Sequence, residues 1–287
     1  MTKNKNDIIL IPTDFSEVCN NAVEHGLVLA KNLNFRVFLI HVINKDTKKY
    51  LEDKHIDRDV LNEKLNKLTE DYSKKFGVPV EYLIKTGNLF DKVKDVSEKL
   101  GVRLIILGTH GKVGFQKLTG SYVLKMITAT DVPTVVVQKR SFTEGYKNIV
   151  FPITAQTQDR QKVVWAINIA KTFDATIHLI PKFESEKFYK KKIMSVTKQI
   201  KNLFDEYDVK YLDKVSSPEA GNFAKQVVDY AVVKEAELIM TLVNKDKSLF
   251  FSSWDEQIIY NSSQIPVICI NPHSKKKLSG GGGWAFQ

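Results

Sequence analysis

Short apolar segments of strand length recur along the chain, and stretches with helical spacing lie between them. The clearest apolar segments are residues 8–11, 35–42 and 103–107. Their valines, isoleucines and leucines do not alternate with polar residues, which is typical of strands buried on both faces. Strands joined by helices lie parallel, and right-handed connections place helices on both sides of the sheet. The pattern therefore predicts an α/β fold built on a doubly wound parallel sheet.

The order of these segments occurs twice. We expect strands at residues 8–14, 35–42, 80–85, 103–107 and 132–137, and again at 149–154, 175–180, 209–215, 237–241 and 265–270. The two sets end alike, in Pro-Thr-Val-Val-Val and Pro-Val-Ile-Cys-Ile. A chain of 287 residues suits two domains. We predict domains at 1–142 and 143–274, followed by a flexible glycine-rich tail at 275–287.

Composition excludes several classes of protein. The net charge is +10, but the lysines are interleaved with acids on the expected helix faces, which argues against a nucleic-acid partner. No apolar run approaches the roughly 20 residues that span a membrane, and no secretory signal is visible. Cys19 and Cys269 stand alone, and the histidines lack metal-ligand spacing, so neither a disulfide framework nor a metal site is expected. We expect a cytoplasmic protein without a membrane or nucleic-acid partner.

The apolar run at 104–107 breaks into a glycine-rich loop that contains Gly108, Gly111 and Gly120 and ends at Ser121. Glycine allows a ligand to approach the backbone closely. The helix expected after the loop offers unpaired N–H groups to an anion. In doubly wound sheets, ligands bind beyond the carboxyl ends of the strands where the strand order reverses. Asp14, Val42 and Gly108 fall at such ends, which favours a site for a phosphate-bearing ligand.

At this point the chain resembles the universal stress protein family in its tandem, two-domain form, over residues 5–140 and 145–272. The resemblance rests on Ile-Pro-Thr-Asp-Phe-Ser at 11–16, His41-Val42, Leu-Gly-Thr-His-Gly at 107–111, and Gly120-Ser121. It implies two adenine nucleotide alpha hydrolase-like repeats packed as a pseudo-dimer. In the family the fifth strands of two domains pair edge to edge, and further association into a homodimer is compatible with that arrangement.

The resemblance also implies a function, because the family divides into members that bind ATP and members that do not, and the residues that follow are those of the binders. The aspartate of the first strand contacts the nucleoside, the valine backbone of the second strand meets the base, and the glycine loop with its serine holds the phosphates. We therefore expect a regulatory rather than catalytic protein that binds ATP or a related adenine nucleotide, with or without Mg²⁺. The expected site residues are Pro12, Thr13, Asp14, Val42, Gly108, His110, Gly111, Gly120, Ser121 and Tyr122.

Two departures from the family pattern leave alternatives open. The family motif has nine residues between its second and third glycines, whereas eight residues, 112–119, stand here. One residue of extended chain reaches about 3.5 Å, comparable to a hydrogen-bond length. The second half carries Thr154 in place of Asp14, Leu-Val-Asn-Lys at 242–245 and Trp254 near the expected Gly-Ser. It is predicted to be a degenerate domain with a structural role.

The alternatives are a scaffold of the same fold that binds no nucleotide and, less favoured, an enzyme with at most slow ATP hydrolysis. His110 is interpreted as a solvent-facing turn residue rather than a catalytic one. Ser121 is interpreted as a helix cap and phosphate donor, because no histidine–acid pair is placed to activate it. For Cys19, near the start of the first helix, a buried small residue is favoured over a thiol of lowered pKa.

Overall fold

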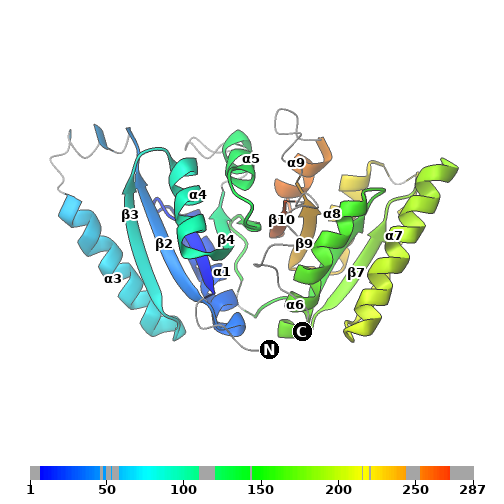
Figure 1. Cartoon of the computed structure of the whole chain (residues 1–287), viewed down its shortest axis with the longest axis horizontal. Helices are drawn as coiled ribbons and strands as arrows, with labels where there is room; N and C mark the ends of the chain where they lie inside the picture. Colours follow the sequence, from blue (N-terminus) through cyan, green and yellow to red (C-terminus); the bar gives the residue numbers. More distant parts are fainter. Residues whose placement is uncertain are drawn as a thin grey trace. The chain divides into compact units, whose positions relative to one another are not determined.

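The computed structural model describes residues 7–45, 48–49, 53, 58–109, 120–142, 144–214, 216–219, 221–243 and 253–271. The chain divides into two compact units, Met1–Glu144 and Gly145–Gln287, called unit 1 and unit 2 below. Unit 1 runs from blue to green in Figure 1, and unit 2 from green to orange. Each unit is described by itself.

Unit 1 holds five parallel strands in the order β3-β2-β1-β4-β5. Its elements along the chain are β1 (Ile8–Pro12), α1 (Glu17–Leu33), β2 (Arg36–Ile43), α3 (Arg58–Phe76), β3 (Val80–Thr86), α4 (Leu89–Leu100), β4 (Val102–Gly108), α5 (Gly120–Ala129) and β5 (Thr134–Val137). The chain first builds the sheet outward through β2 and β3 and then returns to place β4 on the other side of β1. The strand order therefore reverses between β1 and β4.

The helices of unit 1 cover both faces of its sheet. Right-handed connections place α1 and α3 on one face and α4 and α5 on the other. Consistently, α1 contacts α3, and α4 contacts α5. Figure 1 shows α3 running alongside β3. Strands β1, β2 and β4 are buried almost throughout, as expected for strands without polar alternation.

Local capping chemistry sets the ends of the helices. Ser16 caps α1 by accepting a hydrogen bond from the N–H of Cys19, and Asn34 ends that helix in the left-handed conformation. Asn88 caps α4 by accepting from two N–H groups of its first turn. Gly101 ends α4 with a φ of 62°, where a side chain would be disfavoured. Serine at an N-cap and glycine at a C-cap are the residue types typical of these positions.

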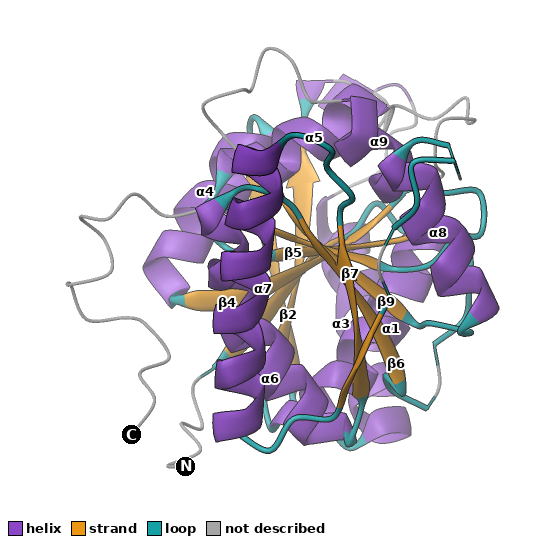
Figure 2. Ribbon diagram, turned by 90° about the vertical axis from the view of Figure 1, so that its right-hand side faces the viewer, coloured by secondary structure: helices purple, strands orange, loops and turns teal. Residues whose placement is uncertain are grey.

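Unit 2 repeats the strand order of unit 1, read as β8-β7-β6-β9-β10. Its elements are β6 (Asn148–Ile153), the 3₁₀ segment η1 (Thr157–Lys162), α6 (Val163–Phe173), β7 (Thr176–Pro181), α7 (Lys187–Glu206), β8 (Tyr211–Asp213), α8 (Phe223–Val233), β9 (Leu238–Leu242), α9 (Ser253–Ile259) and β10 (Val267–Ile270). Figure 2 shows α6 and α7 on one side of the strands of unit 2 and α8 on the other. The order reverses between β6 and β9.

The fold-class prediction is confirmed, since both units contain a doubly wound parallel sheet. Several strands are shorter than expected by about two residues, and the largest difference is at 209–215, where β8 covers only Tyr211–Asp213. Within unit 2, β8 is an edge strand: its three residues pair with β7, and Leu212 is half exposed. The packing of the two repeats against each other stays a prediction, and the tail expected at 275–287 lies outside the described residues.

Candidate functional site

The carboxyl end of β1 leads into a tight turn that presents one carboxylate to solvent. Pro12 and Thr13 are buried, whereas Asp14 is exposed. The N–H of Thr13 donates to the carbonyl of Ile40 at 3.0 Å, which ties the turn to β2. The hydroxyl of Thr13 accepts from the N–H of Phe15 at 3.1 Å. Thr13 thus holds the turn together, and Asp14 is the residue of the turn with a free face.

The Asp14 carboxylate is held ionised. Partial desolvation acts to raise its pKa, but hydrogen bonds from the side chain and backbone of Ser16 lower it further, and the net pKa lies below the ordinary value. The N–H of Ser16 donates to Asp14 Oδ1 at 2.9 Å. The remaining lone pairs of the carboxylate face outward beside the N-terminus of α1, where they can accept from the hydroxyls of a ligand.

An aromatic and cationic cluster flanks Asp14, and sequence reasoning missed it. Phe15 adopts a positive φ of 66°, and its ring centroid lies 5.0 Å from that of His41. Lys64 Nζ from α3 stands 4.0 Å from the Phe15 ring centroid, within cation–π range. In the sequence, the helical spacing around Lys64 shows only that this residue lies on a helix. It does not show that the helix faces the turn that contains Phe15.

His41 is a neutral positioning group. Its Nδ1 lies 2.9 Å from the carbonyl of Thr13, and because a carbonyl only accepts, Nδ1 is the protonated nitrogen. Burial lowers the pKa of His41, and the Thr13 carbonyl and the Asp14 charge offset this only in part. The next residue, Val42, is buried near the carboxyl end of β2, in register with Lys85 of β3. Val42 therefore lies at the same edge of the sheet as Asp14.

Gly108 ends β4 at the switch point, and its missing side chain has a structural reason. A Cβ added there would lie 2.4 Å from the carbonyl oxygen of Val18 in α1. The backbone of α1 therefore occupies the space that a side chain would need. Thr109 follows, fully buried, and its N–H donates to the carbonyl of Val137 at 2.9 Å. This glycine allows the N-terminus of α1 to approach the end of β4.

The start of α5 reaches the same edge. Gly120 is the first residue of the helix, and the side chain of Ser121 lies outside what the structure describes. Tyr122 is half buried, with its ring centroid 4.6 Å from that of Phe90. Burial, and then the negative charge of Asp14, raise the pKa of Tyr122 to about 12. The Tyr122 hydroxyl therefore stays neutral and can donate a hydrogen bond.

Two of the predicted site residues are not placed, and one alternative for Cys19 can be tested. His110 and Gly111 lie outside the described residues, so the structure does not place them. Cys19 is buried, and burial followed by the Asp14 charge raises the pKa of its thiol to about 12. The alternative of a thiol with a lowered pKa is therefore wrong. Within the described residues, no cluster of three or more histidine, cysteine, aspartate or glutamate side chains could hold a metal.

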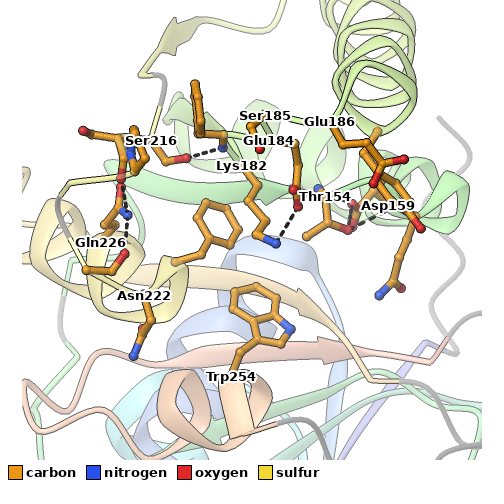
Figure 3. Close-up of a pocket in the computed structure, with 18 of the residues that line it drawn as sticks. Thr154, Asp159, Lys182, Glu184, Ser185, Glu186, Ser216, Asn222, Gln226 and Trp254 are labelled. Carbon is orange, nitrogen blue, oxygen red and sulfur yellow. Dashed lines mark hydrogen bonds and ion pairs between the residues drawn. The ribbon is translucent and has the colours of Figure 1, made fainter.

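The corresponding edge of unit 2 contains a cavity of about 820 Å³ (Figure 3). Thr154 follows β6 there, and its N–H and hydroxyl both donate to Asp159 Oδ2, at 2.7 and 2.8 Å. Asp159 Oδ1 pairs with Lys162 Nζ at 2.9 Å, and both side chains are almost fully buried. Lys162 also donates to the carbonyl of Pro152 at 2.5 Å and lies over the Phe151 ring. A buried ion pair thus stands behind Thr154.

Two doubly wound sheets, one with an ionised aspartate at its switch point and one with a cavity there, define a class of small-ligand-binding α/β proteins. The sequence profile of the universal stress protein family matches residues 5–138, which is nearly all of unit 1. Residues 5–138 therefore form a universal stress protein domain. None of the described helices is long and apolar enough to cross a membrane.

Relatives of known name agree with this assignment. The universal stress protein MJ0577 of Methanocaldococcus jannaschii is 29% identical over 155 residues, which cover 46% of this chain and 95% of that protein. MJ0531 of the same organism is 28% identical over 142 residues, which cover 46% of this chain and 81% of that protein. A crystal structure of a universal stress protein from Archaeoglobus fulgidus shares the fold, with a TM-score of 0.77 and 16% identity over 94% of this chain and all of that chain.

Proposed function

We propose that unit 1 binds an adenine nucleotide, ATP with or without Mg²⁺, and that the protein acts as a regulator rather than an enzyme. The observation that carries the proposal is the exposed, ionised carboxylate of Asp14 at the switch point, the edge of the sheet at which α5 also begins. Ligands of doubly wound sheets bind at this edge. The universal stress protein domain at 5–138 supports the choice of an adenine nucleotide.

The residue roles follow from what each group can donate or accept. Asp14 accepts hydrogen bonds from the ribose hydroxyls, and the backbone near Val42 meets the base. The N-terminus of α5 at Gly120 directs unpaired N–H groups toward the phosphates. The roles of His110, Gly111 and Ser121 in holding phosphates rest on the family resemblance alone.

A regulatory role is supported by the state of the reactive groups beside Asp14. The Cys19 thiol stays protonated because burial raises its pKa, so it is a poor nucleophile at neutral pH. The neutral His41 uses its Nδ1 proton on the Thr13 carbonyl. A cytoplasmic location belongs to the same proposal, and it is supported by the two cysteines, which are buried and form no disulfide.

Calorimetric titration of the intact chain with ATP, with and without Mg²⁺, tests the proposal. We expect one site per chain, and about tenfold weaker binding in Asp14→Asn, which corresponds to about 1.4 kcal/mol. Asparagine keeps an acceptor for the Ser16 N–H and removes only the charge. The control is Glu98→Gln, the same kind of change at an exposed position of α4, which should leave the affinity unaltered.

Absence of heat at millimolar ATP in both conditions would overturn the nucleotide proposal. Binding that Asp14→Asn leaves unchanged would contradict the assigned site. A protein that binds no nucleotide would then be an interaction scaffold with the universal stress protein fold.

A further inference from the structure

The cavity at the carboxyl edge of unit 2 is lined by aromatic and acidic side chains, which do not suit a nucleotide. We propose that it binds a small organic cation, a quaternary or protonated amine on an apolar body. The proposal concerns unit 2 alone and does not depend on nucleotide binding in unit 1. It replaces a purely structural role for the second repeat with a binding role.

Aromatic side chains form much of the cavity wall. Phe183, Tyr189, Phe223 and Trp254 all line it, and they come from four different segments. Trp254 from α9 stacks on Phe223 of α8, with centroids 5.4 Å apart and ring planes 27° apart. Trp254 is half buried, so one part of the indole remains available to a ligand. Aromatic faces attract alkylated ammonium groups through their negative electron density, and tryptophan does so best.

The charged residues that line the cavity favour a cation. They are three acids and one base: Asp159, Glu184, Glu186 and Lys182. The charge of Asp159 is balanced by Lys162 behind it, and Lys182 Nζ pairs with Glu184 Oε1 at 2.6 Å. Glu186, exposed at the start of α7, is left with a net negative charge. Figure 3 shows Glu184 and Glu186 on the opposite side of the cavity from Trp254, with the Lys182 ammonium, paired with Glu184, between Glu184 and the indole. Glu186 is therefore the carboxylate that can meet a ligand held against Trp254.

The same walls disfavour a phosphate. Among the described lining residues the single ammonium group is that of Lys182, which is already paired. The N–H of Thr154, at the end of β6, donates to Asp159 and is not available to an incoming anion. Among the lining residues that the structure describes, carboxylates outnumber ammonium groups three to one, which disfavours a phosphate.

The rim of the cavity is fixed before any ligand binds. Gln226 accepts from the N–H of Ser217 at 2.8 Å and donates to the carbonyls of Ser217 and Gly221, at 2.8 and 2.9 Å. Asn222 caps α8 and donates to Gln257 of α9 at 3.1 Å. These bonds hold α8 and α9 together under Trp254. Binding therefore does not have to create these bonds among the described rim residues, which reduces the cost of association.

Titration of the intact protein with choline tests the proposal, followed by the indole N–H signal of Trp254 in ¹H–¹⁵N spectra. The chain has three tryptophans, and loss of one signal in Trp254→Leu assigns it. We expect choline to shift this signal saturably. Its uncharged isostere 3,3-dimethylbutan-1-ol should bind at least tenfold more weakly, because it has the same shape without the charge.

Two variants separate the carboxylate from general effects on α7. Glu186→Gln should weaken choline binding at least fivefold, whereas the same change at the other end of that helix, Glu206→Gln, should leave it unaltered. Equal binding of choline and its isostere would overturn the proposal in favour of a merely apolar cavity. A Trp254 signal that responds to inorganic phosphate or ATP but not to choline would overturn it in favour of an anion site.

Discussion

The two units have the same strand order, yet each places a carboxylate differently at its switch point. In unit 1 the turn after β1 contains Asp14, whose exposed carboxylate accepts from the Ser16 N–H just before α1 begins. In unit 2 β6 is followed by Thr154, whose N–H donates to the buried Asp159. One edge presents a negative charge to a ligand, and the other keeps its charge internal and neutralised.

The difference originates in how the first helix of each unit begins. In unit 1, α1 starts as a regular helix close to β4, and Gly108 is required because the Val18 carbonyl lies against it. In unit 2 the 3₁₀ segment η1 precedes α6 and carries both Asp159 and Lys162. Leu242, the last residue of β9, stands at the strand end that corresponds to Gly108 and lines the cavity. A change of a few residues at the start of one helix therefore changes the character of a whole site.

The largest expected effect comes from breaking the buried ion pair between Asp159 and Lys162 in unit 2. Lys162→Met leaves the Asp159 carboxylate buried without its partner, which should lower the free energy of unfolding by about 4 kcal/mol. Urea unfolding measures this change. The control Lys225→Met removes the exposed pair with Asp229 and should cost less than about 1 kcal/mol. Adding Asp159→Asn to Lys162→Met should restore part of the loss. Equal costs for the two lysine variants would show that the buried pair has no special role.

The next effect tests the close approach of α1 in unit 1. Gly108→Ala places a Cβ against the Val18 carbonyl, which cannot move without displacing the helix, so we expect a loss of about 3 kcal/mol. Gly101→Ala is the control. A Cβ at this position meets no other atom, so the substitution should lower stability only through the positive φ, by about 1 kcal/mol. Thermal unfolding compares the two. A Gly108→Ala cost no greater than that of Gly101→Ala would contradict the steric explanation.

The smallest effect is the response of unit 1 to pH. His25 of α1 is fully buried, with its ring centroid 3.8 Å from that of Phe142, and burial lowers its pKa to about 3. The unfolded chain takes up a proton below pH 6.5, whereas the folded histidine does not until about pH 3. Stability therefore falls as the pH drops through this window, by about 2 kcal/mol at pH 5.

Denaturation of the protein at a series of pH values measures the slope, and His25→Gln should flatten it. An NMR titration in which the His25 ring of the folded protein takes up its proton near pH 6.5 would disprove the explanation.

Much of the fold could be predicted from the sequence, because burial of both faces of a parallel sheet leaves a strong apolar signal. The run at 8–11 and the final segments at 134–137 and 267–270 all form strands where they were expected. Caps such as Ser16 and Gly101 are also local, since one residue type supplies the chemistry. The edge strand β8 was overestimated because exposed residues such as Leu212 still look apolar in sequence.

The candidate sites were less predictable, because they depend on contacts between distant segments. Asp14 and Tyr122 were found through the family motif, but the stacking of Phe15 with His41 and Lys64 was not. The polar segment Thr157–Lys162 resembles an exposed loop in sequence, although Asp159 and Lys162 inside it are buried. Nothing in the sequence distinguishes a buried ion pair from a solvated one at the same spacing.

The bond between Asp159 and the Thr154 N–H has a consequence for stoichiometry. A carboxylate that the fold holds in place competes with an incoming anion for this N–H without the entropy cost of association. The switch-point amide of unit 2 is therefore permanently saturated by the protein itself. If unit 1 binds ATP as proposed, a titration should reach its plateau at one nucleotide per chain at any cellular concentration, so the protein would report nucleotide level without cooperativity between its two halves.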